Sequence, residues 1–215
     1  MNNSLRGAAR LTGAGIRALL VLTLVCGVLY PLVVTGIAQA AFHHNANGSK
    51  ITVDGRVVGS EHLGQTFDLD RTDRDGNPLP DPRWFQPRPS AAGTNSLNTR
   101  YDLVVSGASN LAADSEELLA AVRERRKRVA AFNGVDPGRV PVDAVTASAS
   151  GIDPDISPAY AELQVARVAR ANGLPEDEVA RLVQDHTDGR LLGFLGEPHV
   201  NVLKLNIALR ELARG

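Results

Sequence analysis

The stretch ALLVLTLVCGVLYPLVVTGIAQAAF, residues 18–42, contains no charged residue, and thirteen of its positions are Leu, Ile, Val or Phe. Twenty-five helical residues rise roughly 37 Å, which is enough to cross a hydrocarbon core of about 30 Å with some tilt. Pro31 has no amide hydrogen, so we expect it to kink this helix. The stretch is therefore predicted to be a single transmembrane helix.

A cleaved signal peptide is the alternative, because Ala38-Gln39-Ala40 has the small-x-small pattern of a cleavage site. The apolar region of a signal peptide spans about 7–15 residues, and the run at 18–42 is longer. Its length therefore favours an uncleaved anchor.

Charge predicts how this anchor is oriented. Arg6, Arg10 and Arg17 precede the apolar run, and no acidic residue does. By the positive-inside rule, residues 1–17 form a cytoplasmic tail, and residues 43–215 lie outside the cytoplasm, held at the plasma membrane.

Composition limits what the remaining chain can be. The protein has 215 residues, 43% of them hydrophobic, and a formal net charge of −1. This length suits one domain, and the charge argues against a nucleic-acid binder, which would normally be basic. The only cysteine, Cys26, lies inside the predicted span, so the outer part contains no thiol.

Capping and stop residues predict four helices in the outer part. Asp114, with Glu117 completing a capping box, starts one helix, and Ser157 starts the next. The predicted helices cover 115–132, 158–172, 175–187 and 200–213. A hairpin is predicted around Asp54-Gly55, with further short strands at 103–105 and 142–145. The fold class is thus a single N-terminal transmembrane helix followed by one mixed α/β (α+β) soluble domain.

Residues 68–83 are polar and rich in proline, which predicts a solvated loop. A calcium loop is the sharper alternative, because Asp73 and Asp75 precede a glycine. Arg71 stands where the first ligand is expected and Pro82 where the closing Glu is expected, so the solvated loop is favoured.

Motifs that would identify an enzyme are missing from the sequence. It has no P-loop, no His-Glu-x-x-His, no Gly-x-Ser-x-Gly and no glycine-rich dinucleotide turn. His43 and His44 stand where the helix meets water, which favours an interfacial role over metal binding. The basic run 123–128 spreads around a helix, and Glu124 can pair with Arg128. We therefore interpret this run as a solvated face of the helix. We predict no catalytic residue and no metal site.

Two segments, 106–111 and 146–154, are rich in small and hydroxyl residues. They can form close-packed turns or a partner surface, or they can wrap an anion with backbone N–H groups. Ser148 or Ser150 could instead be a nucleophile, but the sequence offers no clear base. The close-packed turn or partner surface is the favoured interpretation.

Eight short segments, in order from the span to the last predicted helix, carry a resemblance to a known family. The segments are Leu29-Tyr-Pro-Leu32, Gly59-Ser60, Leu63-Gly-Gln-Thr-Phe67, Trp84-Phe-Gln-Pro-Arg-Pro-Ser90, Ser106-Gly-Ala-Ser-Asn-Leu111, Val145-Thr-Ala-Ser-Ala-Ser-Gly-Ile-Asp153, Gln164 with Arg167-Val-Ala169, and Val200-Asn-Val-Leu-Lys-Leu-Asn206. Together they resemble the KdpC family, the small subunit of the bacterial potassium-transporting Kdp ATPase. Two departures are Ala108, where the family usually has Gly, and the 68–83 loop, which looks like an insertion.

The resemblance implies an accessory, non-catalytic subunit that assembles and regulates a high-affinity potassium pump. Its implied partners are a channel-like potassium-binding subunit (KdpA) and a P-type ATPase subunit (KdpB), with a small single-span subunit (KdpF) as a further candidate. Partner contacts are expected from a set of polar and small residues. These are Pro31, Gln65, Arg88, Ser148, Ser150, Asp153 and Gln164.

The family has also been described as a catalytic chaperone that raises the ATP affinity of the ATPase subunit. No cofactor is then bound firmly, and ATP is a ligand shared with that subunit. The implied nucleotide contacts are Ser106, Gly107, Ser109 and Asn110. ATP is cytoplasmic, however, whereas the charge pattern places these residues outside. We therefore favour an external domain that braces the complex or shapes potassium entry. A membrane-anchored hydrolase that uses Ser148 or Ser150 is the least favoured class.

Overall fold

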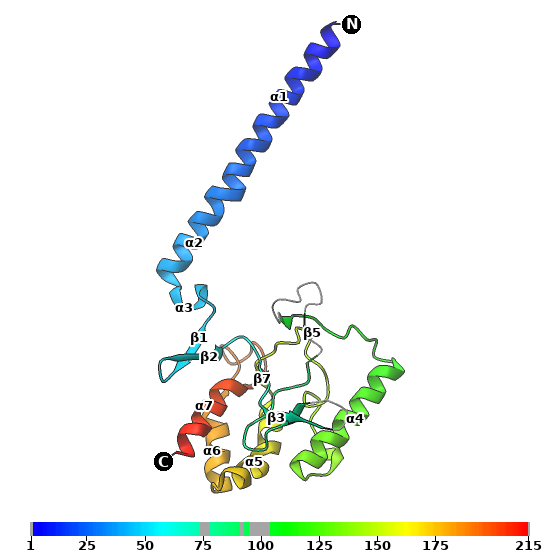
Figure 1. The fold of residues 1–215 in the computed structure, drawn as a ribbon, viewed down its shortest axis with the longest axis vertical. Coiled ribbons are helices and arrows are strands. Elements are labelled where there is room, and N and C mark those ends of the chain that lie inside the picture. Colours follow the sequence, from blue (N-terminus) through cyan, green and yellow to red (C-terminus); the bar gives the residue numbers. More distant parts are fainter. Residues whose placement is uncertain (1, 74–77, 91–92, 95–103, 215) are drawn as a thin grey trace. The chain divides into compact units, whose positions relative to one another are not determined.

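The structure is a computed structural model that describes residues 2–73, 78–90, 93–94 and 104–214. The chain divides into two compact units, Met1–Lys50 and Ile51–Gly215, which are described separately. Figure 1 shows a long helix in the first unit and a mixture of helices and short strands in the second. The predicted class, one apolar N-terminal helix followed by a mixed α and β domain, is confirmed.

The first unit is helical throughout most of its length. It comprises α1 (Asn2–Leu24), a π-helical turn η1 (Val25–Leu29), α2 (Tyr30–Ala41) and a short α3 (His43–Ala46). The continuous stretch Arg6–Ala41 is long and apolar enough to cross a membrane. Its large apolar side chains are exposed in the isolated chain, as expected of a surface that lipid or another helix covers.

A change of helix type stands at the place of the predicted kink. The amide of Tyr30 donates to the carbonyl of Val25, five residues back, as in a π-helix. Pro31 follows directly, and proline can neither donate to the residue four back nor tolerate that carbonyl close to its ring. The wider π turn provides the space that the ring needs.

The first strands of the domain form three two-stranded sheets. β1 (Lys50–Val53) pairs with β2 (Arg56–Ser60), β3 (Asp68–Thr72) with β4 (Pro78–Pro80), and β5 (Gly93–Thr94) with β6 (Val104–Val105). The predicted turn is confirmed, because Asp54 and Gly55 both have positive φ, at 51° and 75°, as a type I′ turn requires. The 68–83 segment was predicted as a loop, and this was wrong in part because β3 and β4 pair within it.

The rest of the unit is mainly helical. It contains α4 (Glu116–Asn133), a 3₁₀ turn η2 (Pro137–Arg139), α5 (Pro158–Asn172), α6 (Glu176–Asp185) and α7 (Val202–Leu212). A three-stranded antiparallel sheet of order β7-β9-β8 joins them, formed by β7 (Asp155–Ile156), β8 (Thr187–Asp188) and β9 (His199–Asn201). The four predicted helices are confirmed with small shifts of their ends. The predicted strand at 142–145 is wrong, because Val145 closes a turn onto the carbonyl of Val142.

Caps explain where the helices start and end. Ser157 accepts a hydrogen bond from the amide of Tyr160, and Gly173 ends α5 with φ of 68°, as predicted. For α4 the cap is Ser115, which accepts from the amide of Leu118, and the predicted cap Asp114 lies one residue too early. Both residues are good caps, so the sequence alone did not separate them.

The core lies among α5, α6, α7 and the extended segment 84–86. Phe85, Val168, Val179, Leu205 and Leu209 are fully buried there. Extended backbone in such a core needs partners for its N–H and C=O groups. Side chains of the two flanking helices supply them. Asn206 of α7 bonds to both the N–H and C=O of Phe85, and Gln164 of α5 does the same for Gln86.

Candidate functional site

Three segments that are distant in sequence meet around the hydroxyl-rich residues. We call the residues Ser90, Ser106, Gly107, Ser148, Ser150 and Gly151 the serine junction. The Ser106 hydroxyl and the Gly107 amide both donate to the carbonyl of Ser150, each at 2.8 Å. The Ser90 hydroxyl donates to the carbonyl of Gly151 at 2.5 Å, and the Ser148 amide donates to the carbonyl of Pro89 at 3.0 Å. The two predicted segments thus form one structure.

Within this junction, serine hydroxyl oxygens accept hydrogen bonds from backbone N–H groups. Ser148 accepts from the amides of Ser150 and Gly151, at 3.2 and 3.0 Å, and Ser150 accepts from the amide of Ile152 at 3.2 Å. An anion wrapped by this turn would need those same N–H groups. Between residues 148 and 152 the geometry is therefore that of a close-packed turn.

The geometry also gives no support to a serine nucleophile. The side chain of Ser148 is buried, and its hydroxyl is hydrogen-bonded to two backbone amides and to the Ser150 hydroxyl, 3.1 Å away. A nucleophilic serine needs an accessible hydroxyl bonded to a base. Neither serine has such a base among its hydrogen-bond partners in the described part of the chain.

An ion pair lies beside the junction. Nη1 of Arg88 donates to Oδ2 of Asp153 at 2.9 Å, and both side chains are about one quarter exposed. The Arg88–Asp153 pair is thus a contact inside the domain, in addition to any contact with a partner. Gly64 packs on its backbone: the Gly64 amide bonds to the carbonyl of Ile152, and a Cβ at position 64 would overlap the carbonyl oxygen of Asp153.

Carboxylates gather near this pair without forming a metal centre. Asp155 lies 4.0 Å from Nε2 of His199, and burial raises the pKa of Asp155. Asp188 lies at the same distance from that nitrogen. Among the described residues, no group of three or more His, Cys, Asp or Glu is arranged to hold a metal ion.

Ser109 and Asn110 lie apart from the junction's hydrogen bonds and are exposed. Asn110 has a positive φ of 52°, and its amide donates to the carbonyl of Ala108. The left-handed residue of this segment is thus Asn110 and not residue 108. Alanine at position 108, the departure noted in the sequence, therefore carries no backbone strain.

Gln164 does not reach the surface. It is 0% exposed. Its side-chain Oε1 accepts from the N–H of Gln86 and from Nη2 of Arg167, each at 2.7 Å, and its Nε2 donates to the carbonyl of Gln86. The side chain of Gln164 thus bonds inside the domain, and the partner contact predicted for it stays a prediction. Pro31, also predicted as a partner contact, lies in the apolar helix of the first unit.

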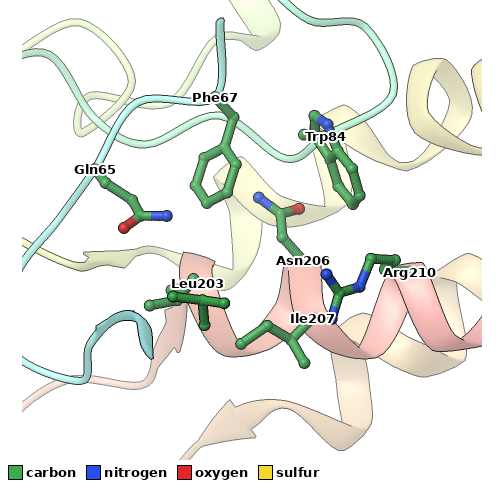
Figure 2. Close-up of a pocket in the computed structure, with 8 residues that line it drawn as sticks. Gln65, Phe67, Trp84, Leu203, Asn206, Ile207 and Arg210 are labelled. Carbon is green, nitrogen blue, oxygen red and sulfur yellow. The ribbon is translucent and has the colours of Figure 1, made fainter. Parts of the chain in front are cut away.

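Gln65 lines a pocket at the surface of α7, which Figure 2 shows. We call it the α7 pocket, and its volume is about 260 Å³. Its lining is Val58, Gln65, Phe67, Trp84, Leu203, Asn206, Ile207 and Arg210. Phe67 and Trp84 lie 6.4 Å apart between ring centroids, so aromatic rings form much of the wall facing the helix.

Comparison with known proteins shows which family this chain belongs to. A family model described as the c chain of the K⁺-transporting ATPase, KdpC, matches residues 12–211. The chain belongs to the KdpC family. A relative from Streptomyces coelicolor, named potassium-transporting ATPase KdpC subunit, is 57% identical over 99% of this chain and 97% of its own. Relatives of the same name from Kineococcus radiotolerans and Mycobacterium tuberculosis are 49% and 47% identical, covering 99% and 90% of this chain.

Several residues of this KdpC-family chain that shape its interior were not singled out from the sequence. Arg167 is buried, and it donates to Asn133 at 2.9 Å, to the carbonyls of Pro82 and Trp84, and to Gln164. Burial lowers the pKa of Arg167 to about 10. Arg167 and Asn206 lie in segments that carry the family resemblance. That resemblance was the one feature of the sequence that could have pointed to them.

Proposed function

We propose that this chain is the accessory, non-catalytic subunit of a high-affinity, ATP-driven potassium uptake complex. In this proposal the chain is needed for assembly and regulation of the ATPase and channel-like subunits. The observation that carries it is membership of the KdpC family over residues 12–211, with relatives named as subunits of a potassium-transporting ATPase. The apolar helix Arg6–Ala41 supports a place in the membrane beside other subunits.

The proposed partners are the channel-like subunit (KdpA), the P-type ATPase subunit (KdpB) and a small single-span subunit (KdpF). The surface proposed for them includes Gln65, Arg88 and Asp153, which are partly exposed. The proposed topology has the N-terminus in the cytoplasm, because three arginines precede the apolar run.

The test is deletion of this chain from a cell whose growth at low potassium depends on the complex. Deletion should prevent isolation of an intact complex and abolish growth at micromolar potassium, and the full-length chain should restore both. Normal assembly and uptake without the chain would refute the proposal.

A second candidate function is that of a catalytic chaperone that raises the ATP affinity of the ATPase subunit. Ser109 and Asn110 favour it, because both side chains are exposed and follow Ser106 and Gly107 in the chain. It requires these residues to share a compartment with ATP.

Topology separates the two candidates. A C-terminal tag on the full chain should be removed by protease added to intact spheroplasts if the outer domain lies outside the cytoplasm. Protection of the tag until lysis, with a known external protein cleaved in the same sample, would favour the chaperone. A labelled ATP analogue should then bind, and binding should weaken when Ser106 and Ser109 are replaced with alanine.

A further inference from the structure

The turn between β8 and β9 exposes four large apolar side chains within five consecutive residues. Leu191, Leu192 and Phe194 are 68%, 78% and 70% exposed, and Leu195 is 47% exposed. We call these four side chains the apolar tip. The other exposed large apolar side chains in the described part of the second unit stand singly in the sequence: Val57, Leu63, Leu119 and Val142. Single exposed apolar residues are normal, whereas a cluster indicates a surface that a partner covers.

The backbone of this turn is strained at Leu192. Its φ is 54°, in the left-handed region, where a bulky side chain is disfavoured and glycine or asparagine fits. The other non-glycine residues with positive φ in the described part of the chain are small and polar: Ser49, Asp54 and Asn110. A leucine that is both strained and exposed gains nothing in the isolated domain. Strain of this kind is typical of functional sites, so it indicates that the Leu192 side chain makes a contact outside the domain.

The turn that carries the apolar tip is already ordered in the isolated chain. Leu191 and Leu195 exchange backbone hydrogen bonds of 2.8 and 3.0 Å, and the amide of Phe194 donates to the carbonyl of Leu191. At the base of the turn, Nη2 of Arg190 donates to Oε2 of Glu197 at 2.6 Å. A pre-formed turn loses little conformational freedom when it binds. An apolar centre beside a polar rim is also the arrangement found at the centre of protein interfaces.

Charge argues against the lipid bilayer as the surface that covers the apolar tip. Residues 51–215 carry 19 basic and 24 acidic side chains. Segments that lie in the membrane interface are instead rich in Lys and Arg, because bilayer surfaces are negatively charged. Arg190, which precedes the tip, is paired with Glu197, and Asp188 adds a further exposed carboxylate. The tip therefore fits a protein surface better than a lipid surface.

Size argues against a second copy of this chain as the partner. A stable interface buries about 800 Å² and roughly 20–30 residues on each side. The apolar tip has only four residues. In the proposed function, the apolar helix Arg6–Ala41 already holds the chain beside other subunits, so the effective concentration of the partner is high and a few anchoring side chains are sufficient.

We propose that the apolar tip docks into an apolar pocket on another subunit of the potassium uptake complex, with the Arg190–Glu197 pair at the rim of the contact. This inference rests on the proposed function, because that function supplies the partner subunit. Side chains this exposed on a tight turn can be covered only by a concave surface. The partner's pocket is therefore lined by apolar side chains, with polar groups at its edge.

Thiol labelling tests whether the apolar tip is covered in the complex. Cys26 is the only cysteine, so in a Cys26→Ala background an introduced cysteine is the only thiol of this chain. Leu191→Cys reports on the tip, and Val142→Cys is the matched control, because both native side chains are 68% exposed. A soluble maleimide should label both at similar rates in the full chain alone in nanodiscs. In the complex isolated through a tag on the ATPase subunit, labelling of Leu191→Cys should be about tenfold slower or more, and labelling of Val142→Cys should be unchanged.

A second variant removes the apolar character of the tip while the fold remains. Leu192→Asn combined with Phe194→Asn should restore fast labelling of Leu191→Cys in the complex. Asparagine adopts a positive φ more readily than leucine, so the Tm of the full chain should not fall. A clear decrease in Tm would mean that the tip supports the fold, and would overturn the docking role. Val142→Asn should leave the protection of Leu191→Cys intact, and loss of protection in this control would overturn the assignment of docking to the tip.

The outcomes separate this inference from the proposed function. Failure of the wild-type chain to co-purify with the ATPase subunit would refute the proposed function itself. Co-purification with equally fast labelling of Leu191→Cys in the complex and in the chain alone would overturn the inference alone. Slow labelling of Leu191→Cys in the chain alone would overturn the subunit as the partner. It would identify the bilayer if the protection disappears in detergent, and a second copy of this chain if the protection grows with chain concentration in detergent.

Discussion

Replacing Gln164 with leucine should destabilise the second unit, Ile51–Gly215, by about 3 kcal/mol. The side chain is fully buried and serves three groups: the N–H of Gln86 at 2.7 Å, the C=O of Gln86 at 3.1 Å and Nη2 of Arg167 at 2.7 Å. Leucine has a similar volume, so it leaves little cavity, but it leaves these three groups without a partner. Each unsatisfied buried group costs about 1–3 kcal/mol. Burial of the additional apolar surface offsets about 1–2 kcal/mol of the total.

Unfolding of the full chain in detergent, followed by the fluorescence of Trp84, measures this effect. For a domain of this size, 3 kcal/mol corresponds to a decrease in Tm of about 6–12 °C. Gln184→Leu is the matched control, because Gln184 is exposed on α6 and its replacement should change stability by less than about 0.5 kcal/mol. A Tm for Gln164→Leu equal to that of wild type would refute the reasoning that these three hydrogen bonds stabilise the domain.

Three further predictions concern the same domain. Gly64→Ala should cost about 1–3 kcal/mol, because its Cβ would overlap the carbonyl of Asp153, whereas Gly107→Ala meets open space and should be tolerated; urea unfolding compares the two. Hydrogen bonds from Arg83 lower the pKa of Asp81 below 3.8, so the stability that this pair provides is complete above about pH 4 and is lost as pH falls through the lowered value. Urea midpoints between pH 6 and pH 2 should therefore fall less steeply in Asp81→Asn, and equal slopes would contradict this. Ser148→Ala should cost about 1–2 kcal/mol by freeing two amides, while Ser109→Ala should be neutral; equal unfolding midpoints for the two variants would argue against the close-packed turn.

Local signals were sufficient where one stretch of chain decides its own conformation. The charge-free run predicted the apolar helix, Asp54-Gly55 predicted the hairpin, and Ser157 and Gly173 predicted both ends of α5. Each of these features depends on contacts within a few residues. The sequence pattern therefore contains the necessary information.

Features that depend on distant contacts could not be predicted in this way. The strands β7 and β8 have two residues each, too short to show an alternating pattern, and they exist because β9 pairs with both. The 142–145 segment is apolar because Ala144 and Val145 are buried in a turn, not because it pairs in a sheet.

The candidate site shows the same division. Small and hydroxyl residues marked two of the three segments of the serine junction, but the meeting of those two through the carbonyl of Ser150 is a tertiary contact across 44 residues. Asn206 meets Phe85 across 121 residues, and nothing local distinguishes it from a solvent-exposed asparagine.

The π-helical turn before Pro31 changes which side chains share a face of the apolar helix. Successive residues of an α-helix are about 100° apart, and the extra residue in the turn advances everything after it by about that angle. A row of side chains on one face of α1 therefore continues along α2 with different residues from those that an uninterrupted α-helix would place on that face. Any neighbouring helix that lies against both halves meets two different sets of residues. A search for its contacts that assumes one unbroken heptad pattern would select the wrong positions beyond Leu29.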